Sequence, residues 1–128
     1  MTGKSKSFGE VFDAHTAAKF QTRDTLVSRT VGKSQLVDEL ILSFTHDCEM
    51  PAILPGIKPT GRKVAVPTVV SVGFDQDSQI THEHIYWDQA TMLVQLGPLD
   101  KSALPVTGAE QTARLIDPKL PSNTLIPK

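Results

Sequence analysis

Two long stretches of alternating residues limit this chain to folds built on an antiparallel sheet. In the first, from Gln35 to Asp47, one alternate set is mainly apolar: Leu36, Asp38, Leu40, Leu42, Phe44 and His46. In the second, from Lys63 to Phe74, the alternate set is Val64, Val66, Thr68, Val70, Val72 and Phe74. A repeat of two is typical of a strand with one buried face, because successive side chains of a strand point to opposite sides. Each stretch is therefore predicted to be a long strand.

Shorter strands are predicted beside the long pair. One runs from about Thr25 to Val31 and the other from Gln79 to about Trp87, and turn residues separate each from its long neighbour. Pro67, within the second long stretch, predicts a bulge or an exposed sheet edge, because proline has no amide hydrogen to donate. Consecutive strands without helical crossovers predict an antiparallel sheet and an α+β fold.

Three helices are predicted around this sheet. Residues spaced by three and four predict one helix over Phe8–Phe20, near the N-terminus. Gln89–Leu96 is the second, with Asp88 placed as its N-cap and a Gly-Pro pair ending it. A third is predicted over 107–116, where Thr107 begins a capping-box pattern.

Length and composition indicate one domain in a reducing compartment. The domain is expected to span 1–128, with flexible tails over 1–7 and 118–128. A formal net charge of -1 provides no basic field for nucleic acid or anionic lipid. Cys48 is the one cysteine and cannot form an intramolecular disulfide. Since no apolar run is long enough for a signal peptide or a membrane span, a cytoplasmic location is expected.

The last predicted strand carries most of the residues suited to acid–base chemistry. His82, His84, Tyr86 and Asp88 alternate and therefore share one face. If that face is concave, a carboxylate and two imidazoles line one wall of a pocket and can move protons near neutral pH. His46, at the end of the first long strand, is expected to approach the same pocket beside the apolar residues of its own strand.

Each of these residues also has a plainer interpretation. Asp88 before a helix can serve as an N-cap as readily as a base, and the two roles can coexist. A histidine in a strand is more often a surface or structural group. The His82-x-His84 pair has no further ligand at a fixed spacing, so no metal site is predicted. Cys48 lies between two acidic residues, which disfavour the thiolate, and is not predicted to be a nucleophile.

The run from Ile80 to Gly97 resembles the closing strand and helix of SnoaL-like proteins, in which a Trp-Asp pair precedes Leu-x-Gln-x-Gly. Upstream, Phe44–Asp47, Leu54–Gly56 and Pro59–Arg62 are also similar to this family, which belongs to the nuclear-transport-factor-2-like superfamily. The similar part extends from about Val27 to Leu115. The resemblance implies a cone-shaped α+β barrel made of a curved antiparallel sheet and N-terminal helices, commonly a homodimer through the outer sheet face. This chain departs from the family in its shortened N-terminal region, where one helix is expected.

The resemblance also implies a function. Family members cyclise polyketides, or isomerise, dehydrate or open epoxides, without a cofactor, and in the cyclases an aspartate is the acid/base. The chain is therefore expected to be a cofactor-free cyclase or isomerase acting on a hydrophobic, carbonyl-bearing polyketide or terpenoid intermediate of secondary metabolism. Asp88 would move the proton, while His84 and His82 would hydrogen-bond the developing enolate oxygen. The residues expected to contact the substrate are His46, Tyr86, Phe44 and Trp87.

Two other functions stay open at this stage. The first is a non-catalytic module that binds a small molecule or dimerises. The second is a hydrolase of epoxides or lactones. Replacing Asp88 by Asn separates these functions, because an enzyme should lose turnover while a binding module should change little.

Overall fold

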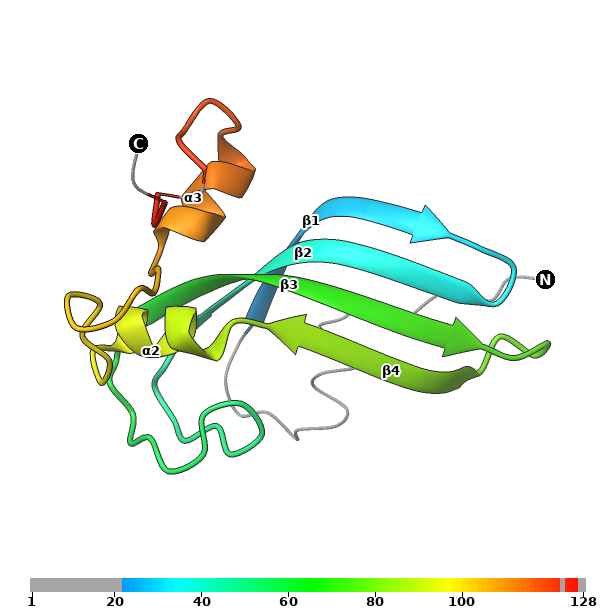
Figure 1. Ribbon diagram of the computed structural model, residues 1–128. Helices are drawn as coiled ribbons and strands as arrows, with labels where there is room; N and C mark the ends of the chain where they lie inside the picture. The colour runs from blue at the N-terminus through cyan, green and yellow to red at the C-terminus, as the bar shows by residue number, and fades with distance from the viewer. Residues whose placement is uncertain (1–21, 123, 127–128) are drawn as a thin grey trace.

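The fold is a curved, four-stranded antiparallel sheet with two short helices (Figure 1). A computed structural model of the chain describes residues 22–122 and 124–126, so the helix expected over Phe8–Phe20 lies outside the described residues. The elements in chain order are β1 (Thr22–Val31), β2 (Gln35–Thr45), β3 (Lys63–Phe74), β4 (Ile80–Trp87), α2 (Gln89–Leu96) and α3 (Glu110–Ile116). Each strand is antiparallel to the next, in the order β1-β2-β3-β4. The predicted strand order is confirmed, and no helix of the described residues is long and apolar enough to cross a membrane.

One face of the sheet packs against the core, and we call it the inner face. The buried apolar side chains that it contributes are Leu36, Leu40, Leu42, Phe44, Val64, Val66, Val70 and Val72. The segment between β2 and β3 adds Met50, Ile53 and Leu54, and α2 adds Met92 and Leu96. In the view of Figure 1 that segment lies below the sheet and α3 stands above it. The apolar face predicted for β2 is therefore confirmed, and burial of each large apolar side chain contributes about 1.5–3 kcal/mol.

Helix α2 begins and ends at the residues that the sequence predicts. The Asp88 carboxylate accepts hydrogen bonds from the amides of Ala90 and Thr91, at 3.0 and 3.4 Å. Gly97 follows the helix with φ 103°, a left-handed conformation that favours glycine. Its N–H donates to the Leu93 carbonyl at 3.0 Å, which closes the last turn.

Gln95, the glutamine of the Leu-x-Gln-x-Gly pattern, has a structural role in joining α2 to β3. Its Oε1 accepts from the Ala65 N–H and its Nε2 donates to the Ala65 carbonyl, both at 3.0 Å. The pairing of β3 with β4 ends at Thr68 opposite Trp87, so Ala65 lies where β4 no longer covers that side of β3. The Gln95 amide therefore replaces the hydrogen bonds of a strand and joins α2 to the sheet.

Pro67 lies at the same open edge. Alternate residues of an antiparallel strand direct their backbone groups to the same side, so the Pro67 nitrogen points where the Ala65 N–H points, away from β2. The pairing with β2 continues without a shift through Pro67, which lies opposite Ile41. Of the two interpretations of this proline, the exposed edge is confirmed and the bulge is wrong.

Helix α3 begins later than the sequence predicts. Its N-cap is Ala109, which makes no capping bond from its side chain. Glu110 instead accepts from the Gly108 N–H at 2.6 Å, and the Thr107 hydroxyl lies 3.4 Å from that of Thr91. The capping box predicted at Thr107 is therefore wrong, because its hydroxyl contacts α2 and not the first turn of α3.

Candidate functional site: the inner face of the sheet

The two faces of β4 are the reverse of those expected for a pocket. His82, His84 and Tyr86 are exposed and lie on the outer face of the sheet. The half-buried residues that alternate with them, and that pair with inner-face residues of β3, are Glu83 (opposite Val72), Ile85 (opposite Val70) and Trp87 (opposite Thr68). The expectation that the histidines and Tyr86 share the buried face with Phe44 is therefore wrong. The alternation itself is confirmed, but Ile85 and Trp87, not the histidines, mark the side that packs on the core.

The Asp88 carboxylate is engaged by the first turn of α2. In addition to the two amide hydrogen bonds, its Oδ2 accepts from the Thr91 hydroxyl at 2.9 Å. The side chain is exposed to solvent, beyond the last residue of β4. These contacts are those of an N-cap.

His46 is fully buried beyond the end of β2, where the Pro-Thr-Gly-Arg segment holds it. Its Nδ1 accepts the Thr60 N–H at 3.2 Å and lies 3.1 Å from the Thr60 hydroxyl. In the neutral ring the proton must therefore lie on Nε2, which has no hydrogen-bond partner among the described residues. Along β2, His46 is about 20 Å from Leu40, the residue level with Trp87. It does not approach the β4 histidines.

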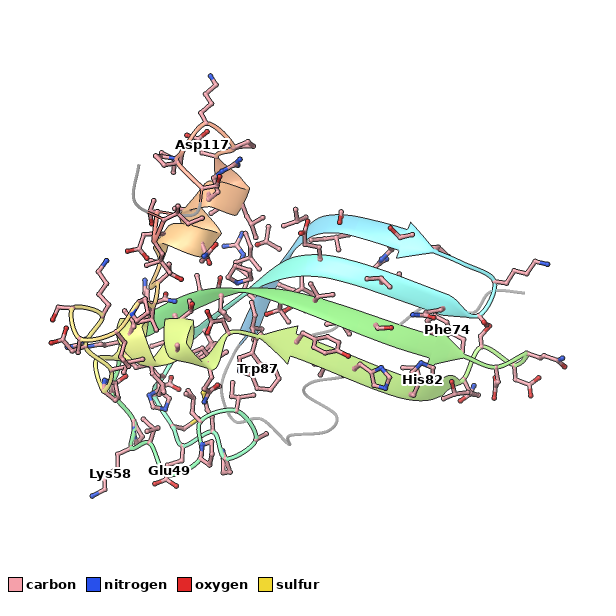
Figure 2. All side chains as sticks on the ribbon, in the orientation of Figure 1. Glu49, Lys58, Phe74, His82, Trp87 and Asp117 are labelled. Carbon is pink, nitrogen blue, oxygen red and sulfur yellow. The ribbon has the colours of Figure 1, made fainter. Side chains whose placement is uncertain are left out.

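The His82 and His84 rings lie beside each other on the outer face, with their centroids 5.0 Å apart. The His82 ring, labelled on β4 in Figure 2, lies so close to Gly73 of β3 that a Cβ on Gly73 would lie 2.2 Å from the ring Cε1. Glycine at this position therefore allows the imidazole to lie against the sheet. Within residues 22–122 and 124–126, no three His, Cys, Asp or Glu side chains are grouped to hold a metal ion.

Carboxylates from three strands lie on the inner face: Asp24 of β1, Asp38 of β2 and Glu83 of β4. Asp38 is 5% exposed and lies between apolar neighbours, where an unpaired charge would be costly. Arg29 compensates this charge, with Nε 2.6 Å from one Asp38 oxygen and Nη2 2.8 Å from the other. Hydrogen bonding to Asp38 raises the pKa of the Arg29 guanidinium.

Trp87 is oriented by its neighbours at the end of β4 (Figure 2). Its indole Nε1 donates to Gln89 Oε1, and Gln89 Nε2 donates to the Ile53 carbonyl, both at 2.8 Å. The aromatic ring is thereby tied to the segment between β2 and β3. The inner face thus combines apolar walls, an oriented aromatic ring and the carboxylate of Glu83 on the same strand.

Arg29, Asp38 and Glu83 were not predicted from the sequence as candidate site residues. For two of them a signal was present, because Glu83 alternates with Ile85 and Trp87, and Asp38 with leucines. An ionisable residue inside an otherwise apolar alternate set predicts a polar group facing the interior. Arg29 has no such signal, since a change of register in β1 decides which way it points.

Comparison with known proteins finds similarity in structure only: no family model and no curated protein sequence matches the chain. The structural similarity is to proteins of solved structure. One is a proposed SnoaL-like polyketide cyclase from Jannaschia sp. CCS1, 23% identical, with 70% of this chain and 60% of that chain covered and a TM-score of 0.55. TsrD from Streptomyces laurentii is 20% identical, with 69% and 60% covered and a TM-score of 0.53. AclR, a proposed hydroxylase from Streptomyces galilaeus, is 20% identical, with 71% and 65% covered and a TM-score of 0.52.

At 20–23% identity, this likeness shows the fold alone. The chain spans 60–65% of the length of these three proteins. The fold class expected from the resemblance is thus confirmed as a curved antiparallel α+β sheet. The closed, cone-shaped barrel stays a prediction.

Proposed function

We propose that this chain is a cyclase or isomerase that uses acid–base catalysis, without a cofactor, on a hydrophobic, carbonyl-bearing small molecule of the polyketide or terpenoid kind. The observation that carries the proposal is the β4 side of the inner face, where half-buried Glu83, Ile85 and Trp87 border the apolar core. Small-molecule sites are mostly apolar surfaces with a few directed polar groups. The fold shared with a proposed polyketide cyclase supports the same class of substrate.

In this proposal Glu83 is the acid/base in place of Asp88. Its carboxylate takes a proton from the carbon next to the ligand carbonyl and returns it to another atom of the ligand, so that no co-reactant is consumed. Val72 and Ile85 are its apolar neighbours on the sheet, and an environment poor in water strengthens interactions with a developing enolate. Asp38 suits this role less, because it is 5% exposed whereas Glu83 is half-buried.

Proton exchange in heavy water tests this function. The probe is 1-tetralone, a bicyclic aromatic ketone, and NMR follows the loss of the proton signal next to its carbonyl. The wild-type chain should accelerate the exchange, and Glu83→Gln should lose about 10²-fold or more of the acceleration, as expected when a general base is removed. His84→Gln changes an exposed side chain of the outer face and is the matched control, which should match the wild type. Full activity of Glu83→Gln would refute the assignment.

A non-catalytic binding module is the second candidate. It is favoured by the structural use of two carboxylates, Asp88 as an N-cap and Asp38 as the partner of Arg29. In that case 1-tetralone should shift the methyl NMR signals of Ile85, the half-buried neighbour of Glu83 on the same face of β4, without any acceleration of exchange. The methyl signals of Val69, on the outer face, are the internal control for non-specific binding.

We further propose that the chain forms a homodimer through the outer face. Val69 and Tyr86 lie opposite each other on β3 and β4 and are 39% and 62% exposed. Two exposed side chains of this size on one face support contact with a second copy.

A further inference from the structure

The two histidines of β4 lie at the spacing of a pair of metal ligands. His82 and His84 are exposed on the outer face, and their ring centroids are 5.0 Å apart. Zinc bound at about 2.0–2.1 Å from a ring nitrogen lies about 3.2 Å from the centre of that ring, so two rings at a tetrahedral angle have centres about 5.2 Å apart. The observed separation is therefore close to that of two imidazoles bound to one zinc ion.

A bulge in β4 places a hydroxyl beside His82. The pairing of β3 with β4 shifts after Gly73, which lies opposite His82, so that Thr81 is an extra residue of β4. Neighbouring side chains of a regular strand point to opposite faces, but here Thr81 Oγ1 lies 3.2 Å from His82 Nδ1. Bulges re-aim side chains in this way and are frequent beside functional sites.

The contact with Thr81 leaves one nitrogen of His82 for a metal ion. When Nδ1 carries the proton and donates it to the Thr81 hydroxyl, the lone pair of the ring lies on Nε2. Metal-binding histidines are generally oriented by a hydrogen bond of this kind from their second nitrogen. Gly73 also positions the ring, because Cε1, between the two nitrogens, is the ring atom nearest to where a Cβ of Gly73 would lie.

His84 supplies the second imidazole. It lies two residues further along β4, opposite Ser71, and its ring makes no hydrogen bond within residues 22–122 and 124–126. In the same part of the chain, no three His, Cys, Asp or Glu side chains are grouped around one point. Water would therefore fill the other positions around an ion, which makes this an open site rather than a closed structural one.

We propose that His82 and His84 together bind one divalent transition-metal ion of the zinc kind, with Thr81 as a positioning residue. The sequence predicts no metal site at this pair, because a His-x-His spacing alone is unspecific. The separation of the rings, the Thr81 contact and the fit of the His82 ring over Gly73 carry the proposal. Imidazole nitrogens select zinc, copper or nickel over magnesium and calcium, which prefer oxygen ligands.

This site goes beyond the proposed function and is independent of it. The histidines lie on the outer face, whereas Glu83 lies on the inner face. His84→Gln therefore stays the control for proton exchange, which is measured without metal.

A zinc titration followed by NMR of the histidine ring protons tests the inference. Zinc chloride is added at a pH slightly above neutral, because metal ions bind the neutral imidazole. The signals of His82 and His84 should shift together and saturate at one ion per chain, whereas those of His46, which is fully buried, should not move. Magnesium chloride is the control and should shift none of them.

Single substitutions separate a chelating pair from two independent histidines. His82→Gln and His84→Gln each leave one imidazole, and each should weaken zinc binding by about tenfold or more, because the second ligand no longer acts at a high effective concentration. Thr81→Val removes the hydroxyl and should weaken zinc binding by about tenfold or more, whereas Thr81→Ser keeps the hydroxyl and should bind zinc as the wild type does. All three positions are exposed, and thermal unfolding without metal checks that each variant is folded.

Three results would count against the site. Zinc binding that is unchanged in either histidine variant would overturn the proposal, because the ion would then not be held by the pair. Equal shifts with magnesium would mean that charge alone moves the signals, and would also overturn it. If Thr81→Val binds zinc as tightly as the wild type, the positioning role of Thr81 is overturned.

Discussion

The carboxylate of Asp88 accepts hydrogen bonds from two amides and one hydroxyl at the start of α2. Asp88→Ala removes all of these acceptors, and we expect the free energy of unfolding to fall by about 1–2 kcal/mol. Asp88→Asn keeps an acceptor in the same place and should lower the unfolding free energy far less. Urea unfolding of the two variants measures the difference. A loss in the Asn variant as large as in the Ala variant would show that the charge, and not the cap, matters.

Gly73 and His82 form a cross-strand pair in which a glycine accommodates an imidazole. In the Gly73→Ala variant the new Cβ would lie 2.2 Å from the ring, so the ring must move. In a His82→Ala background the ring that a methyl group would meet is gone, and Gly73→Ala should stabilise the fold by about 0.4–1 kcal/mol by restricting the unfolded chain. With His82 present, the gain in unfolding free energy should be smaller or become a loss, because the ring must move.

Thermal unfolding of the wild type, the two single variants and the double variant measures this coupling. Equal effects of Gly73→Ala in the two backgrounds would mean that the contact with the His82 ring contributes nothing to stability.

Single residues also show where prediction from the sequence stopped. The alternation of β4 correctly separated His82 and His84 from Glu83, because side-chain direction follows from strand geometry alone. Which set faces the core depends on the apolar content of each set, and Ile85 with Trp87 decides it. The extra residue at Val27 could not be predicted, since a bulge is fixed by the pairing of two strands and not by one segment.

Among the elements, α2 is hydrogen-bonded to the backbone of β3 by one side chain. The Gln95 amide makes two hydrogen bonds to the backbone of Ala65. Gln95→Ala leaves the Ala65 N–H without its partner in a half-buried position, so we expect the free energy of unfolding to fall by about 1–3 kcal/mol. Gln111→Ala, on the exposed side of α3, is the control and should have little effect. Chemical denaturation of the two variants provides the comparison, and equal stabilities would contradict the proposed attachment.

Helix α3 carries an ion pair that predicts a pH dependence. Hydrogen bonds from Lys101, and then from the backbone amides of Glu110 and Gly108, lower the pKa of Glu110 from 4.5 to about 2. A carboxyl group whose pKa is lower in the folded state stabilises the fold above its unfolded-state pKa, and this contribution is lost as the pH falls from 4.5 towards 2. Both side chains are 42–56% exposed, so the contribution is below about 1 kcal/mol.

Glu110→Gln should therefore lower the free energy of unfolding near neutral pH and have little effect near pH 2, provided that the chain is still folded there. Urea unfolding of the variant and the wild type across this range measures the change. A destabilisation that does not vary with pH would show that packing, and not the charge of Glu110, is responsible.

Elements were predicted well where a local period or a local cap specifies them. Strong alternation specified β2 and β3, and the Asp88 and Gly97 signals specified α2. The predicted start of α3 was wrong, because the Thr107 hydroxyl contacts the hydroxyl of Thr91, in a segment distant in sequence. Tertiary contacts of this kind compete with capping and cannot be read from one segment.

On the scale of the molecule, the two faces of the sheet differ in chemistry. The inner face is apolar, with Glu83 and the Arg29–Asp38 pair, whereas the outer face of β4 carries exposed histidines and Tyr86. The sequence and its resemblance predicted a curved antiparallel sheet, but placed the acid–base groups on the face where the structure has surface groups. A ligand site on one face leaves the other available for contact with a second copy, as proposed above.

Replacement of outer-face residues tests that contact. Val69 and Tyr86 pair directly across β3 and β4, so a charge at either position would be buried in an interface between two outer faces. Because burying an unpaired charge is costly, Val69→Glu and Tyr86→Glu should each convert a dimer to a monomer, measured by light scattering during size-exclusion chromatography. Thr30→Glu, on the outer face at the far edge of the sheet in β1, is the control and should stay dimeric. A wild-type chain that is monomeric at every concentration, or Glu variants that remain dimeric, would place the contact elsewhere or exclude it.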